Sequence, residues 1–223
     1  MWPTSPDGLI EEQHTLALAT PAPWRPGDGT IAIGACAIVF GRGLAGPGAR
    51  GDPAWAAAVT LLRRRVVAEA IVQGEAAGQY IPGLLALREG PSLEAAVRAL
   101  AITPEVLLVD ATGRDHPRRA GLTVHLGAIL DLPTVGVTHR PLLAQGLWPD
   151  DERGAHAPLT IDGSVVGAWL RTRRGARPVA IHPGWRTTLE DAIDVVSRAA
   201  RGHRTPEPLR HARHVARIAR ANG

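Results

Sequence analysis

Glu89 and Asp110 are the residues best placed for chemistry in this 223-residue sequence. Asp110 follows the apolar run VLLV, and Glu89 lies in LLALREGP, directly before a predicted helix. Side chains at strand ends leave the core while staying on a rigid frame. Two converging carboxylates would supply the oxygen ligands that Mg²⁺ prefers. Each residue also has a purely structural explanation, because acids stabilise the first turn of a helix and Asp caps turns.

The segment QYIPG (79–83) contains the single tyrosine of the chain, Tyr80. Pro82 fixes the backbone and Gly83 permits positive φ, so the aromatic ring is expected on a stiff loop. One interpretation is a half-buried tyrosine at the sheet edge. The other is a wedge of Tyr80, Ile81 and Pro82 that enters between stacked bases.

The elements that position these residues alternate between strand and helix. Apolar segments predict strands at 30–40, 54–62, 63–74, 105–110, 132–138 and 178–185. In 54–62 and 63–74 the alanines leave a helical interpretation open. Helical patterns cover 8–20, 118–130, 187–200 and 208–219, and a further helix is expected to begin at Ser92 as its N-cap and to end at Pro104. The segment 159–173 reads as a hairpin that turns at Asp162-Gly163. We therefore expect one α/β domain over 1–223, with a mixed central sheet flanked by helices and an appended β-hairpin.

Composition indicates a cytoplasmic protein without disulfides. Apolar residues make up 45% and charged residues 21%, and Cys36 is the only cysteine. No apolar run has the length of a membrane span, so no membrane association is expected. All 25 basic residues are arginine, and the net charge of +4 permits nucleic-acid binding. Arginines are frequent between 171 and 220, as in a solvated helix or in a binding face.

Three motifs in series, with a short fourth, resemble the endonuclease V family. They are QYIPGLLALREGPSLEAAVRAL, PEVLLVDATGRDHPRRAGLTVHLGAILDLPTVGVTHRPL, VVGAWLRTRRGARPVAIHPGWRTTLEDAIDVV and RTPEPLR. The resemblance runs from about 31 to 213 and implies an RNase H-like fold, in agreement with the elements above. It also implies a DNA-repair nuclease that uses Mg²⁺, or Mn²⁺, and recognises deaminated bases, chiefly hypoxanthine (inosine), in DNA or RNA. We expect it to act as a monomer.

The resemblance assigns roles to individual residues. Tyr80, with Ile81 and Pro82, would fill the space left when the deaminated base leaves the stack. The residues implied for the base pocket are Gly83, Leu85, Ala111, Gly113, His116 and Leu122. The family usually has glycine where this chain has Ala111, so its methyl group narrows the pocket.

The catalytic set implied by the family is incomplete in this chain. Glu89 and Asp110 match catalytic, metal-binding acids. Cys36 stands where the family has a metal-binding Asp, His139 where it has Lys, and Trp185 where it has His. A neutral thiol is a poor ligand for Mg²⁺, so the ion is expected to bind weakly if at all.

Two functions follow from these departures. One is an endonuclease that cuts a phosphodiester bond near the deaminated base, with His182 or Glu190 compensating for the lost residues. The other is a catalytically impaired relative that only binds deaminated or branched nucleic acid. A metal hydrolase acting on a small substrate has weaker support.

Overall fold

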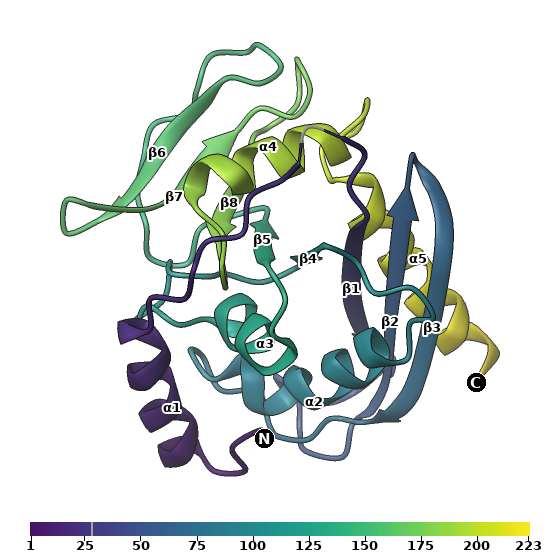
Figure 1. Cartoon of the computed structure of the whole chain (residues 1–223). Coiled ribbons are helices and arrows are strands. Elements are labelled where there is room, and N and C mark those ends of the chain that lie inside the picture. Colours follow the sequence, from purple (N-terminus) through teal and green to yellow (C-terminus); the bar gives the residue numbers. More distant parts are fainter. Residues whose placement is uncertain (28) are drawn as a thin grey trace.

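One mixed sheet of eight strands forms the centre of the computed structural model, which describes residues 1–27 and 29–223. The strand order is β3-β2-β1-β4-β5-β8-β7-β6 (Figure 1). The strands are β1 (Ile33–Phe40), β2 (Pro53–Leu62), β3 (Arg65–Glu75), β4 (Val106–Val109), β5 (Thr134–Thr138), β6 (His156–Ile161), β7 (Ser164–Leu170) and β8 (Val179–Pro183).

The middle of the sheet is parallel and its flanks are antiparallel. β4 pairs in parallel with both β1 and β5, as the strand–helix–strand pattern predicted. β2 and β3 extend the sheet on one side, and the β6–β7 hairpin is joined to it through β8. The carboxyl ends of β4 and β5 therefore meet at one edge, where Asp110 and Thr138 lie.

Helices cover both faces of the sheet (Figure 1). They are α1 (Pro6–Leu18), α2 (Leu85–Arg98), α3 (Leu122–Leu130), α4 (Leu189–Ala199) and α5 (Glu207–Asn222). Because strand side chains alternate between faces, Ala35 and Ala37 of β1 join the core beneath α4 and α5. Cys36 points to the other face and packs in the core with residues of α1, α2 and α3.

Two predicted helix starts are wrong. α2 begins at Leu85, so Ser92 is not its N-cap, and Glu89 lies inside the helix rather than before it. Pro91 removes one backbone hydrogen bond, but buried Leu87 and Leu93 on either side pack into the core and offset that loss. α3 begins at Leu122 instead of Arg118, because the chain turns through a left-handed residue before it.

The predicted mixed sheet with flanking helices and an appended hairpin is confirmed. The β6–β7 hairpin turns at Asp162 and Gly163, which both have positive φ, as a two-residue turn of this type requires. Within the described part of the chain, no helix combines the length and apolar character needed to cross a membrane.

Candidate functional site

Cys36, Glu89 and Asp110 lie near one another at the carboxyl edge of β4, close enough for the two acids to influence the thiol. Cys36 lies opposite Val109 in the β1–β4 register, Asp110 follows Val109, and Glu89 comes from α2. Burial and the nearby negative charges of Glu89 and Asp110 together raise the pKa of the Cys36 thiol far above its usual value. The Cys36 side chain is therefore neutral.

Glu89 is also affected by its surroundings. Burial, and then the charge of Asp110, raise the pKa of Glu89 to about 7, although neighbouring Arg88 acts in the opposite direction. Near neutral pH, a large share of the molecules therefore carry this side chain as an uncharged carboxylic acid.

Asp110 is paired with an arginine from the last helix. Arg213 of α5 places Nη2 2.6 Å and Nε 3.1 Å from the same oxygen, Oδ2. The Arg213 side chain is 19% exposed and that of Asp110 is 45% exposed. The cation facing Asp110 is thus a guanidinium group supplied by the protein itself.

His139 lies beside this ion pair, just beyond the end of β5. Burial and the charges of Arg204 and Arg213 lower its pKa, and Asp110 opposes them. Its Nε2 lies 3.0 Å from Oγ1 of Thr205. His139 therefore brings no fixed positive charge to the site. The permanent cation beside Asp110 is the guanidinium group of Arg213.

The remaining candidate residues are Trp185, His182 and Glu190. Trp185 packs in a cluster with Leu16 and Val124, between α1 and α3. His182 is fully buried, with Nε2 3.0 Å from Oγ1 of Thr138, and burial lowers its pKa to about 4. Glu190 lines a hollow beside β6 and β7. Within the described residues, neither a hydrogen bond nor an ion pair joins these three side chains to Glu89 or Asp110.

The donor set does not fit a hard divalent cation. Cys36 is held as a neutral thiol, and Arg213 occupies one oxygen of Asp110. Mg²⁺ requires anionic oxygen ligands, and a positively charged guanidinium repels a second cation. Among the described residues, no three His, Cys, Asp or Glu side chains are grouped so that they could hold a metal ion.

A cavity of about 220 Å³ opens next to Asp110, and we call it the Tyr80 cavity. Its lining residues are Gln13, Tyr80, Ile81, Gly83, Leu85, Ala86, Asp110, Ala111, Thr112, His116, Leu122, Thr138 and Leu142. It brings together five of the six residues expected in a base pocket, without Gly113, and two of the three expected in a wedge, without Pro82. Its volume is smaller than that of a typical site for a drug-sized molecule.

The carbonyl group of Gly83 holds the wedge loop in place. It accepts hydrogen bonds from Nη2 of Arg118 at 2.9 Å, from Nε2 of His116 at 3.0 Å and from Nε2 of Gln13 at 3.1 Å. The backbone N–H of Arg118 donates to Nδ1 of His116, so the proton of this histidine is on Nε2. Burial lowers the His116 pKa to about 4, which keeps the ring neutral.

A second clamp fixes the other end of this loop. Arg88 is 4% exposed and donates to the carbonyl groups of Ala49 at 2.6 Å and Gly78 at 3.2 Å. It also pairs with Asp52 at 2.7 Å. The backbone N–H of Tyr80 donates to the carbonyl group of Gly48. Tyr80 itself remains 43% exposed on this supported loop.

Sequence reasoning missed Gln13 and Arg213. Gln13 is 1% exposed on α1, in the same stripe as buried Leu9 and Leu16. A polar residue at helical spacing within an apolar stripe was a signal that it has a partner. Arg213 had no such signal, because its role depends on how α5 crosses the end of the sheet.

Comparison with known proteins agrees with this geometry. The family model for endonuclease V matches residues 36–214. The chain belongs to the endonuclease V family. An endonuclease V from Methanothrix thermoacetophila is 46% identical over 142 residues, which cover 64% of this chain and 63% of that protein, just under two thirds of its length. One from Roseiflexus sp. is 41% identical over 74% of this chain and 75% of that protein.

Solved endonuclease V structures superpose on nearly the whole chain. The crystal structure from Streptomyces avermitilis has a TM-score of 0.86 at 33% identity, and covers 99% of this chain and 95% of that one. The structure from Ciona intestinalis, in complex with a 24mer DNA that contains an inosine followed by a ribo-adenosine, has a TM-score of 0.79 at 17% identity and covers 97% of each chain. At that identity, the likeness concerns the fold. Endonuclease V is a metal-dependent family, so the donor set described above is a departure within it.

Proposed function

We propose that this endonuclease V family member recognises a deaminated base that has left the nucleic-acid stack and entered the Tyr80 cavity. The observation that supports this most directly is the joint placement of Tyr80, Ile81 and Gly83 with Ala111 and His116 around one small cavity. The inosine-containing DNA in the Ciona complex supports the same class of ligand for this fold.

The clamps around the cavity favour recognition of a base by a rigid site. Gly83 is fixed by three donors, and Arg88 anchors the preceding turn, so little conformational entropy remains to be lost when a base binds. The half-exposed Tyr80 ring is free to stack on neighbouring bases. We infer that binding selects a base already displaced by mispairing.

Binding is the function that the charges favour over hydrolysis. Metal-dependent cleavage needs an ion that neutralises phosphate charge and activates water. Here a guanidinium stands beside Asp110, and it can pair with phosphate but cannot activate water in that way. We infer that the site binds nucleic acid without cleaving it. We also infer that the protein acts as a monomer in the cytoplasm.

Metal-dependent cleavage of the phosphodiester bond is the second candidate. It is supported by family membership and by the proximity of Glu89 and Asp110. The two functions differ in a direct assay. Purified protein is incubated with labelled strands that contain inosine or adenosine, with EDTA, Mg²⁺ or Mn²⁺, and both retention and cleavage are measured.

We expect a preference for inosine in EDTA and no cleavage with either ion. Tyr80→Ala is expected to reduce the ratio of inosine to adenosine affinity about tenfold, whereas Tyr80→Phe keeps the ring and the preference. Cleavage that is lost in both Glu89→Ala and Asp110→Ala would establish the nuclease instead. Equal affinity for the two strands would refute base recognition.

A further inference from the structure

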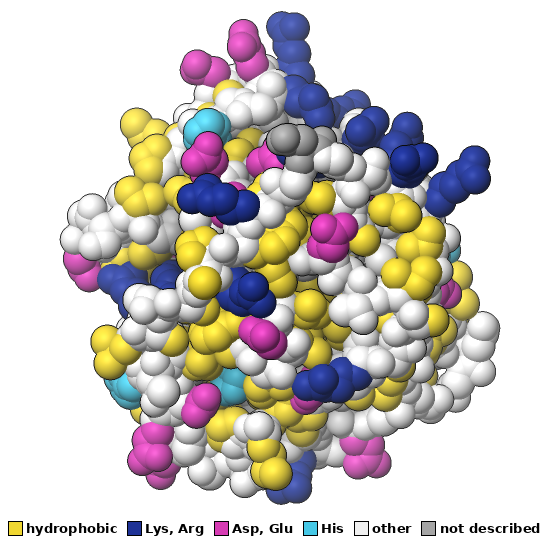
Figure 2. Space-filling model, viewed as in Figure 1, with side chains coloured by type: hydrophobic (Ala, Val, Ile, Leu, Met, Phe, Trp, Pro, Cys, Tyr) yellow, Lys and Arg dark blue, Asp and Glu magenta, His cyan; other side chains and the backbone are white. Residues whose placement is uncertain are grey.

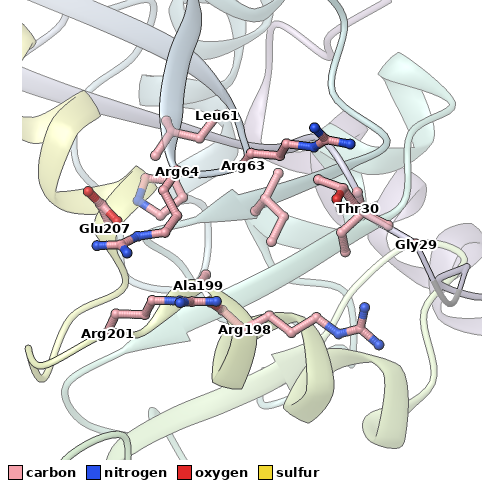
Figure 3. A pocket seen from close by; sticks show the side chains of 12 residues that line it. Gly29, Thr30, Leu61, Arg63, Arg64, Arg198, Ala199, Arg201 and Glu207 are labelled. Carbon is pink, nitrogen blue, oxygen red and sulfur yellow. The ribbon is translucent and has the colours of Figure 1, made fainter.

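A group of arginines surrounds a hollow at the end of the sheet away from Asp110. The hollow, of about 500 Å³, includes Ile33, the first residue of β1, whereas Asp110 follows the last residue of the paired strand β4. Figure 3 shows Arg63 and Arg64 on one side and Arg198 and Arg201 of the α4 end on the other. Besides these four, its lining residues are Gly29, Thr30, Ile31, Ile33, Leu61, Ala199, Glu207 and Pro208.

Arg63 and Arg64 occupy a turn that does not favour them. They are the two residues between β2 and β3 and have φ values of 48° and 70°. Two-residue hairpin turns with positive φ at both positions prefer Asn-Gly. The left-handed conformation costs an ordinary residue about 1–2 kcal/mol. The stability of the turn therefore does not explain why arginine stands at both positions. A binding role for the two guanidinium groups would explain it.

The basic surface continues beyond this hollow. A second hollow is lined by Arg153, Ser197, Arg198, Arg201 and Gly202, and thus shares two arginines with the first. We call Arg63, Arg64, Arg153, Arg198 and Arg201 the arginine surface. Figure 2 shows basic side chains gathered at the upper right, over the end of α4 and the tip of the β2–β3 hairpin. A surface of two joined hollows suits a ligand with successive negative charges.

The loop between α4 and α5 links this surface to the region of Asp110. Thr205 contacts the His139 ring, and Nη2 of Arg204 lies 3.3 Å from the carbonyl oxygen of His139. Arg201 is three residues before Arg204. The loop that begins at the end of α4 therefore reaches the residues beside Asp110.

We propose that the arginine surface binds the phosphate backbone of a nucleic-acid strand, several nucleotides from the base in the Tyr80 cavity. Planar guanidinium groups bind phosphate oxygens in pairs, and the apolar floor around Ile33 and Leu61 accommodates a sugar or a base. Glu207 is the single acid in the lining, and four arginines outnumber it. The position of the base rests on the function proposed above; the phosphate contacts do not.

The turn itself offers a variant that separates charge from folding. Arg63→Asn with Arg64→Gly removes two guanidinium groups and installs the residues that the turn prefers, so the melting temperature should hold or rise. The matched control is Arg42→Gln with Arg217→Gln. It removes the same charge from two exposed side chains that line neither hollow.

Fluorescence anisotropy then compares inosine-containing single strands of about 5 and about 20 nucleotides, one near the lower end of usual single-strand site sizes and one above their range. For the turn variant, we expect affinity for the long strand to fall about three- to tenfold, with the short strand unchanged. The slope of log affinity against log salt should fall by about 1.4, since each phosphate contact on a single strand contributes about 0.7.

Equal behaviour of the turn variant and the control would overturn the proposal. Competition by free inosine monophosphate as strong as that by the long strand would also overturn it, because the site would then take a mononucleotide. The ratio of inosine to adenosine affinity is recorded in the same titrations. A ratio of one with a lost long-strand advantage would refute base recognition while supporting the arginine surface.

Discussion

Arg213 directs both Nε and Nη2 at a single oxygen of Asp110, although the two residues are 103 positions apart in the sequence. A carboxylate at the end of β4 is thus already neutralised inside the folded chain. Together with the neutral thiol of Cys36, this pair removes two of the negative charges that would attract a divalent cation. The site therefore presents fewer unpaired negative charges than three free carboxylates would.

The first prediction concerns metal binding. Cys36→Asp combined with Arg213→Ala adds a carboxylate and removes the competing guanidinium, so this double variant should bind Mn²⁺. At a Mn²⁺ concentration of about 100 times the dissociation constant, binding adds about 2.7 kcal/mol to the free energy of unfolding. This corresponds to a rise of roughly 5–10 °C in Tm. Cys36→Ala with Arg213→Ala is the control and should show no such rise. A comparable Mn²⁺ effect on the unmodified protein would contradict our account of the site.

The second prediction concerns the clamp on Gly83. In the unmodified protein, Nε of Arg118 donates a hydrogen bond of 2.5 Å to Oε1 of Gln13. Gln13→Leu keeps the volume of the side chain but removes this acceptor. Because the site is buried, we expect a loss of about 1–3 kcal/mol in the free energy of unfolding, measured in urea. The preference for inosine should fall with it. His14→Gln, on the exposed side of α1, should change neither quantity.

The third prediction concerns the width of the Tyr80 cavity. Ala111 is 5% exposed and forms part of the wall. Ala111→Val should lower affinity for inosine-containing strands about tenfold, or ~1.4 kcal/mol, by filling space that a base would use. Ala111→Gly should raise it. Affinity for undamaged strands should remain constant in both variants, and a parallel change there would remove the cavity from base recognition.

The fourth prediction concerns pH. The folded-state pKa of Glu89, about 7, lies above its ordinary value of 4.5, so the fold favours the protonated form. The stability contribution of this acid is complete below about pH 4.5 and is lost as pH rises through 7. At pH 8, the free energy of unfolding of the Glu89→Gln variant should therefore exceed that of the unmodified protein by about 1–3 kcal/mol. At pH 4.5 the difference should be small. Urea titrations at the two pH values measure both quantities. Glu190→Gln is the control and should show no such pH-dependent gain.

The sequence predicted the sheet well because its strands are short apolar runs between glycine and proline turns. It also predicted the family. Most of the residues that line the Tyr80 cavity were named from the motifs. The start of α2 was predicted wrongly, since Pro91 looks like a boundary when read locally. Only the packing of Leu87 and Leu93 on the sheet shows that the helix continues through it.

The charge state of the site was beyond sequence reasoning. Asp110 and Arg213 are separated by 103 residues, and their contact depends on the direction of α5 across β1 and β2. Trp185 and His182 were considered for the site because they are the last and first residues of HPGW, the segment that matches a family motif. In the structure, Trp185 packs against α3, and the buried ring of His182 contacts the hydroxyl group of Thr138. The directions of the side chains at the end of β8 and just beyond it decided this, and composition does not reveal them.

Asp115 gives the cavity wall a mechanical property. Its carboxylate is fully buried and accepts from the successive backbone amides of Leu142, Leu143 and Ala144, at 2.6, 2.8 and 2.8 Å. Those three amides are released only if a buried carboxylate is left without partners, which is costly. The segment that carries Leu142 and the segment that carries His116 therefore open together or remain closed together. A ligand that enters the cavity meets one cooperative unit in place of two independent loops.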